Sequence, residues 1–218
     1  MLKYKCIIFD CDGVLVDSEP IASRVLVEMA NELGADINYD FALRNFKGTS
    51  IQECHDQIAA LVTEEMPADF LPNFRTRSFE SFKKDIQPVE GIVDLLNKLT
   101  NDLKIPFCVA SSGPENKIKL NLELTGLLPF FHDRIFSCFA IEKWKPEPDV
   151  FLWAAETMGF EPEECLVIED SVAGITAAKR GGFDVYGYTA HDYVGELKNH
   201  ATLTFNHMSE VINLISKS

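Results

Sequence analysis

From residue 88 onward, apolar segments typical of strands alternate with segments typical of helices. The expected strands are 105–110, a short one near 134–138, 165–170, 183–188 and 201–205. Strands separated by helices form βαβ units, in which the strands of one sheet run parallel. The apolar run IIF at the start of the chain supplies one more strand. We therefore expect an α/β fold with a doubly wound, Rossmann-like parallel sheet.

Residues 17–86 have a different pattern, because they are almost wholly helical in character and contain no convincing strand. We expect Ser18 to cap a first helix, and Ser50 with Glu53 to form a capping box that opens a second. A third helix should begin within 67–72. This stretch is expected to be a helical insertion after the first strand.

The length of 218 residues and the 46% hydrophobic content suit one domain with a sizeable insertion. The expected core therefore comprises 1–16 and 87–218, with 17–86 inserted. No apolar run approaches the roughly 18 residues of a membrane span, and the N-terminus lacks the features of a signal peptide. Six singly scattered cysteines fit neither a disulfide framework nor a zinc site. We expect a cytoplasmic protein.

The formal net charge of −14 argues against nucleic acid or an anionic membrane as a partner, since both need a basic face. It leaves a small anionic ligand possible, because a local cation can reverse the sign of the potential inside one cleft.

Polar side chains follow the expected strands at their carboxyl ends, where ligands bind to open parallel sheets. They are Asp10 and Asp12 after the first strand, Ser111 and Ser112 after the second, Lys145 after the short third strand and a loop, and Glu169 and Asp170 after the fourth. Each alone is more often a cap, a turn or a surface residue. Their conjunction at strand ends instead indicates a site.

Several carboxylates in one place need a bound cation or a shared proton. Hard oxygen ligands suit Mg²⁺, which also bridges to phosphate. A calcium-binding EF-hand loop that begins at Asp10 would need glycine and an acid where Leu15 and Ile21 stand, so that alternative fails.

Four stretches, "FDCDGVLVDSE", "VASSG", "KWKPEPDVF" and "VIEDSVAGITAAKRGG", resemble the motifs of the haloacid dehalogenase superfamily. The resemblance spans the core, and the helical stretch 17–86 matches the small cap domain of the family in position and length. The subgroup comprises phosphatases and mutases related to beta-phosphoglucomutase. The details "FKG" and "KWKPEP" resemble the phosphogluconate phosphatase branch most. The resemblance implies a magnesium-dependent phosphatase that acts on a sugar phosphate or phosphosugar acid.

The resemblance also implies roles for individual residues. Asp10 would attack phosphorus to form an aspartyl-phosphate, and Asp12 would serve as general acid and then general base. The remaining implied roles are magnesium binding by Asp10, the Asp12 carbonyl and Asp170, with Glu169 in or next to the metal shell, and phosphate binding by Ser111, Ser112 and Lys145.

Departures from the motifs distinguish among relatives. The second aspartate, Asp12, disfavours a true dehalogenase. Ala22 and Ile51 stand where the mutase has a histidine and an arginine, and this favours hydrolysis over isomerisation. Within the insertion, Arg24, Lys47 and Thr49 are candidate substrate contacts by position alone.

Two other functions remain possible at this stage. A phosphorelay receiver domain also gathers acids, a hydroxyl and a lysine at strand ends, but its lysine comes last and it has no insertion. A catalytically inactive phosphate-binding module would typically lack Asp10 or Asp12. The partner we expect is a small phosphorylated metabolite, with neither nucleic acid nor membrane, and the oligomeric state stays open, a monomer being compatible.

Overall fold

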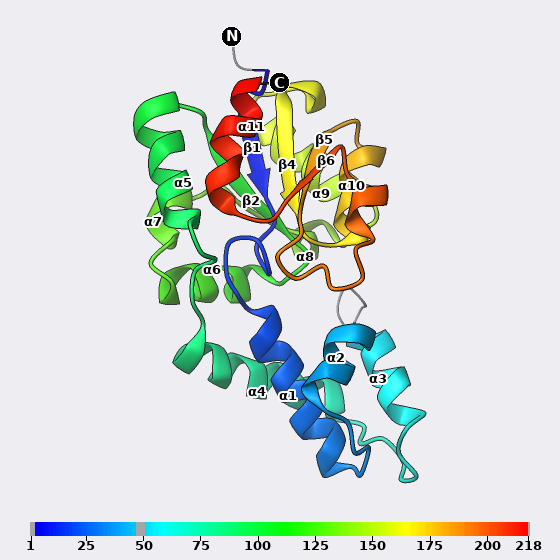
Figure 1. Cartoon of the computed structure of the whole chain (residues 1–218). Coiled ribbons are helices and arrows are strands. Elements are labelled where there is room, and N and C mark those ends of the chain that lie inside the picture. Colours follow the sequence, from blue (N-terminus) through cyan, green and yellow to red (C-terminus); the bar gives the residue numbers. More distant parts are fainter. Residues whose placement is uncertain (1–2, 47–50, 218) are drawn as a thin grey trace. The chain divides into compact units, whose positions relative to one another are not determined.

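The computed structural model describes residues 3–46 and 51–217. The chain divides into two compact units, one formed by Met1–Val16 with Gln87–Ser218 and the other by Asp17–Ile86 (Figure 1). Among the residues that the structure describes, none of the helices combines the length and the apolar character needed to cross a bilayer.

The larger unit is built on a parallel sheet whose strand order is β3-β2-β1-β4-β5-β6. The strands are β1 (Cys6–Phe9), β2 (Phe107–Ser111), β3 (Ile135–Ser137), β4 (Cys165–Glu169), β5 (Asp184–Tyr188) and β6 (Leu203–Phe205). β1 lies in the middle, where Ile8 pairs with Cys108 on one side and with Val167 on the other. The predicted doubly wound α/β fold is confirmed.

Helices connect these strands and cover the sheet. They are α5 (Ile92–Lys98), followed by the π-helical turn η1 (Leu99–Leu103), and α6 (Glu115–Leu124), α7 (Leu128–Phe131), α8 (Cys138–Ile141), α9 (Asp149–Met158), α10 (Val172–Arg180) and α11 (Val211–Lys217). Short 3₁₀ turns occupy η2 (Pro162–Glu164), η3 (Leu197–Asn199) and η4 (Met208–Glu210).

The central strand is buried on both faces, as parallel strands between two helical layers must be. On one face Ile8 packs in a cluster with Phe151 of α9 and Ile175 of α10. On the opposite face Phe107 makes edge-to-face contacts with both Phe9 and Phe131. The apolar run that starts the chain is therefore the centre of the core. All six cysteines are buried free thiols.

The smaller unit consists of helices in its described part: α1 (Glu19–Glu32), α2 (Tyr39–Asn45), α3 (Ile51–Ala59) and α4 (Phe70–Asp85). It has a core of its own, in which Leu26 and Met29 of α1 pack with Phe46, Ile58 and Phe70.

The helix starts in this unit differ in part from those expected. Ser18 precedes α1 but its side chain makes no capping bond, because its backbone is helical (φ −86°, ψ −25°) rather than extended. The expected capping box involves Ser50, which lies outside the described residues. The short helix α2 was not expected, although Asn38 marks its start by accepting a hydrogen bond from the Phe41 N–H at 2.9 Å.

The start of α10 passes so close to the end of β4 that only glycine fits at one position. A Cβ on Gly174 would lie 1.8 Å from Oε1 of Glu169. An alanine inside a helix is normally more stable than glycine by about 1 kcal/mol. At this position the clash makes alanine less stable than glycine.

We therefore expect Gly174→Ala to lower the free energy of unfolding by about 1–3 kcal/mol, the usual cost of overpacking. Urea denaturation measures it. The neighbouring Ala173→Gly, which tests helix propensity alone, should cost about 1 kcal/mol. A Gly174→Ala protein more stable than the parent would contradict the close approach.

Candidate active site

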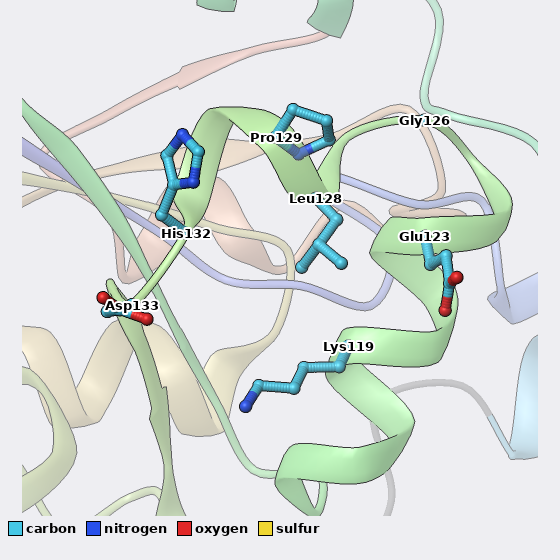
Figure 2. Close-up of a pocket in the computed structure, with 7 residues that line it drawn as sticks. All are labelled: Lys119, Glu123, Gly126, Leu128, Pro129, His132 and Asp133. Carbon is cyan, nitrogen blue, oxygen red and sulfur yellow. The ribbon is translucent and has the colours of Figure 1, made fainter.

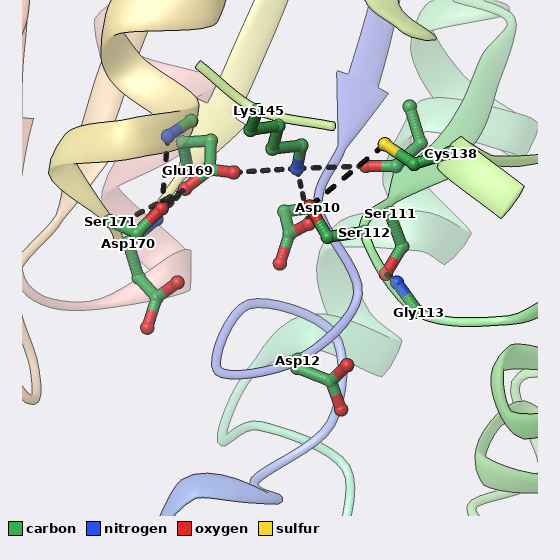
Figure 3. A network of polar contacts seen from close by, with 12 residues as sticks. Asp10, Asp12, Ser111, Ser112, Gly113, Cys138, Lys145, Glu169, Asp170 and Ser171 are labelled. Atoms are coloured by element: carbon green, nitrogen blue, oxygen red, sulfur yellow. Dashed lines mark hydrogen bonds and ion pairs between the residues drawn. The ribbon is translucent and has the colours of Figure 1, made fainter. Parts of the chain in front are cut away.

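The first carboxylate of the site is set by the central strand. The N–H of Asp10 donates to the Ile168 carbonyl at 2.9 Å, which extends the pairing of β1 with β4 by one residue. The chain then turns sharply, with Gly13 at φ +80° and the N–H groups of Leu15 and Val16 both donating to the Cys11 carbonyl. Asp10 thus stands at the carboxyl edge of the sheet, beside the ends of β2 and β4 (Figure 3).

Lys145 joins the ends of three strands (Figure 3). Its Nζ lies 2.6 Å from Oδ1 of Asp10 and 2.7 Å from Oε1 of Glu169, and it donates to the Ala110 carbonyl at 3.1 Å. The three charged side chains are 4%, 10% and 1% exposed, respectively. One ammonium therefore serves two buried carboxylates, and a negative charge is left without a partner among these three groups.

Glu169 uses both of its carboxylate oxygens within the protein. Oε1 accepts from Lys145, while Oε2 accepts from the N–H groups of Asp170 and Ser171 at 2.9 and 2.8 Å and from the Ser171 hydroxyl at 2.9 Å. The Ser171 hydroxyl in turn caps α10 by accepting from the Gly174 N–H at 3.1 Å. Four donors on its two oxygens therefore fix the orientation of this carboxylate.

The pKa values follow from this arrangement. Burial raises the pKa of Asp10 to about 7, because the attraction of Lys145 only partly opposes it and Glu169 and Asp12 add repulsion. Burial alone would lower the pKa of Lys145, but Asp10 and Glu169 together raise it above its ordinary value. Lys145 is a fixed positive charge at neutral pH, while Asp10 needs further positive charge to be fully ionised.

The donor types at this edge, carboxylate and carbonyl oxygens, are the ones that Mg²⁺ prefers. A Cβ on Gly13 would lie 2.2 Å from Oδ2 of Asp170, so the turn after β1 is held directly against that carboxylate. Among the described residues no three His, Cys, Asp or Glu side chains form a closed metal cage. Mg²⁺ needs none, since it is held by one or two carboxylates and keeps its waters and phosphate ligands.

The two serines after β2 differ in their surroundings. The buried Ser111 hydroxyl accepts from the Gly113 N–H at 3.1 Å, and the Gly113 carbonyl accepts from the Ser137 hydroxyl at 2.6 Å. Ser112 is exposed and its hydroxyl is 3.9 Å from Sγ of Cys138. The loop is fixed by these bonds, with Ser111 facing the buried side.

Asp12 is held by two residues that the sequence analysis did not identify. Nζ of Lys117 lies 2.7 Å from Oδ2 of Asp12, and Nδ2 of Asn121 lies 3.5 Å from Oδ1. Both are on α6, which begins just after the serine loop. Their spacing of four residues on one helix face was the available signal, but nothing in the sequence connected that face to Asp12.

Of the three substrate contacts expected in the insertion, Arg24 lies within the described residues. Arg24 is an exposed residue of α1 whose guanidinium lies 3.9 Å from the Asp85 carboxylate. Lys47 and Thr49 lie outside the described residues. Ala22 and Ile51, which replace the two mutase residues, lie on α1 and α3.

A pocket of about 680 Å³ lies elsewhere on the larger unit, against α6 and α7 (Figure 2). It is lined by Lys119, Glu123, Gly126, Leu128, Pro129, His132 and Asp133. It includes none of the strand-end residues, and we assign it no role.

Comparison with known proteins agrees with the motifs. The family of haloacid dehalogenase-like hydrolases matches residues 4–182. The chain is 31% identical over 217 residues to 6-phosphogluconate phosphatase of Escherichia coli, covering 98% of this chain and 96% of that protein. It is 28% identical over 183 residues to a fructose-1-phosphate phosphatase of the same organism, covering 84% and 95%.

Among solved structures, a conserved haloacid dehalogenase-like protein of unknown function from Agrobacterium tumefaciens matches with a TM-score of 0.90. The two are 29% identical, and the match covers 98% of each chain. The chain therefore belongs to the haloacid dehalogenase-like hydrolase family, and it is one of the phosphoric monoester hydrolases of that family.

Proposed function

We propose that this protein is a magnesium-dependent phosphatase that hydrolyses a sugar phosphate or phosphosugar acid through an aspartyl-phosphate on Asp10. The observation that carries this proposal is the shared ammonium of Lys145, which leaves the Asp10–Glu169 pair with one buried negative charge in excess. A divalent cation balances that charge, and together with Lys145 it would offset the charge of a phosphoryl group.

In the first step Oδ2 of Asp10 attacks phosphorus, and the bond from phosphorus to the ester oxygen breaks. Figure 3 shows this second oxygen directed away from the bonds to Lys145. Asp12 gives a proton to the departing oxygen, which leaves as an alcohol. In the second step Asp12 takes a proton from water, which attacks phosphorus, releases inorganic phosphate and restores the Asp10 carboxylate.

The other strand-end residues hold the reacting groups. Lys145 and Ser111 would bind phosphoryl oxygens, with Ser112 at the exposed edge. The Asp10 and Asp170 carboxylates and the Asp12 carbonyl would bind Mg²⁺, which supplies charge neutralisation for the phosphoryl group. Glu169 already makes four hydrogen bonds, so we assign it to positioning Lys145 rather than to metal binding.

The substrate class is proposed from the relatives. Two proteins that align along most of this chain are named for 6-phosphogluconate and fructose 1-phosphate, so both esters belong in a screen with Mg²⁺. Isomerisation of beta-glucose 1-phosphate should be negligible beside hydrolysis, because Ala22 and Ile51 replace the two mutase residues.

Chelation should abolish turnover, because Asp10 and Glu169 share one ammonium and tolerate a bound phosphoryl group only with added positive charge. Phosphate release from 6-phosphogluconate, measured with excess chelator and then with excess Mg²⁺, tests this. Calcium should support little turnover, since its looser coordination misplaces the nucleophile. Full activity in excess chelator would contradict the proposal.

Replacing each aspartate by the nearly isosteric asparagine should reduce turnover to a different extent. Asp10→Asn should remove measurable turnover, because no nucleophile is left. Asp12→Asn should slow hydrolysis of sugar phosphates by about 10²–10⁴-fold, the usual contribution of general acid–base catalysis. Wild-type rates for Asp10→Asn would exclude the aspartyl-phosphate, and unchanged unfolding midpoints in both variants would show that the fold is intact.

Mg²⁺ affinity should fall as the pH is lowered below about 7. The raised pKa of Asp10 means that a proton competes with the cation for this carboxylate. The apparent Kd, measured by calorimetry from pH 8 to pH 5.5, should be nearly constant above 7 and then rise about tenfold per pH unit. Asp10→Asn should bind Mg²⁺ more weakly and lose this dependence. A pH-independent Kd across the range would show that Asp10 does not bind the cation.

A further inference from the structure

We propose that Lys117 and Asn121 on α6 are positioning residues that orient the Asp12 carboxylate for proton transfer to the leaving oxygen. This inference rests on the proposed function, in which Asp12 is the general acid.

The two donors hold the two oxygens of one carboxylate. Lys117 is 2.7 Å from Oδ2 and Asn121 is 3.5 Å from Oδ1. Residues four apart on a helix lie on the same face, so α6 presents both donors together. The side chains of Lys117 and Asp12 are 23% and 20% exposed, so this ion pair is more enclosed than an ordinary surface pair.

The burial of the Asn121 side chain is unfavourable in free energy, and packing does not explain why an amide stands there. Its side chain is fully buried, and among the described residues its Oδ1 has no hydrogen-bond partner. An amide in this setting loses free energy relative to an apolar residue of similar size. The contact that its Nδ2 makes is with Asp12. This contact is long at 3.5 Å, and catalytic hydrogen bonds are often long in the absence of substrate.

Orientation matters here because Asp12 stands apart from the other acids. Its carboxylate lies outside the bonded network of Lys145, Asp10 and Glu169 (Figure 3). Lys117 and Asn121 each contact one oxygen of this carboxylate, and these two contacts favour one orientation of it. A displacement of about 1 Å in a catalytic group can cost about 100-fold in rate.

The leaving group provides a selective readout. An alkyl or sugar oxygen is a poor leaving group and needs the proton from Asp12, whereas 4-nitrophenolate leaves without one. The value of kcat/KM reports the steps up to loss of the leaving group. A misplaced Asp12 should therefore lower kcat/KM for sugar phosphates and spare it for 4-nitrophenyl phosphate.

The test compares Lys117→Met with Lys119→Met on the same helix, where Lys119 pairs with the exposed Glu115. For Lys117→Met, kcat/KM on 6-phosphogluconate or fructose 1-phosphate, whichever the wild type prefers, should fall about 10–100-fold. On 4-nitrophenyl phosphate it should change less than about threefold. Lys119→Met should match wild type on both, Lys117→Arg should recover most of the loss, and Asn121→Leu should show the same selectivity with a smaller loss.

Equal losses on both esters, or no loss on either, would overturn the positioning role. A gain on the sugar phosphate would also overturn it, because it would show that Lys117 holds Asp12 away from the leaving group. Since 4-nitrophenyl phosphate turnover reports a folded enzyme, misfolding is recognised directly. A wild-type protein inactive on every ester would instead count against the proposed function.

Discussion

The structure depends on one ammonium placed between two buried carboxylates. Lys145 contacts Asp10 after β1 and Glu169 at the end of β4, and it also binds the Ala110 carbonyl of β2. It thereby joins the ends of the three central strands. Removing one partner of a buried ion pair typically costs 3–5 kcal/mol, because a charge is left without compensation. The interaction that positions the proposed nucleophile, Asp10, is therefore also one on which the edge of the sheet depends.

The two carboxylates that share Lys145 differ in what else they bind. Glu169 accepts three further bonds from Asp170 and Ser171, so its orientation is fixed and its oxygens are occupied. Asp10 keeps its second oxygen directed away from Lys145 (Figure 3). Similar acids beside the same cation thus take different roles through the number of donors around each of them. In the proposed mechanism, the excess negative charge on this pair favours a cation, and the cation then favours a phosphoryl group.

Much of the site could be predicted because parallel strands end at one edge, so that Asp10, Ser111 and Glu169 were expected together from strand positions alone. Local signals were less dependable: Ser18 is in the right place to cap α1, but its backbone conformation prevents the bond. Lys117 and Asn121 could not be found, since they lie 105 and 109 residues from Asp12 and meet it only because β2 is adjacent to β1. Strand order, which no single segment specifies, decides such contacts.

An acidic chain can hold an anionic substrate if its positive charges are local, and here the two proposed catalytic aspartates pair with different lysines. Asp10 pairs with the buried Lys145, and Asp12 pairs with the partly exposed Lys117. The separation has a chemical consequence, because a nucleophile must stay ionised while a general acid must bind and release a proton. Two aspartates sharing one cation would titrate as a coupled pair. Because α6 begins beside the serine loop, it supplies Asp12 with a separate partner. The two proposed roles can therefore be assigned to two carboxylates that only one residue, Cys11, separates.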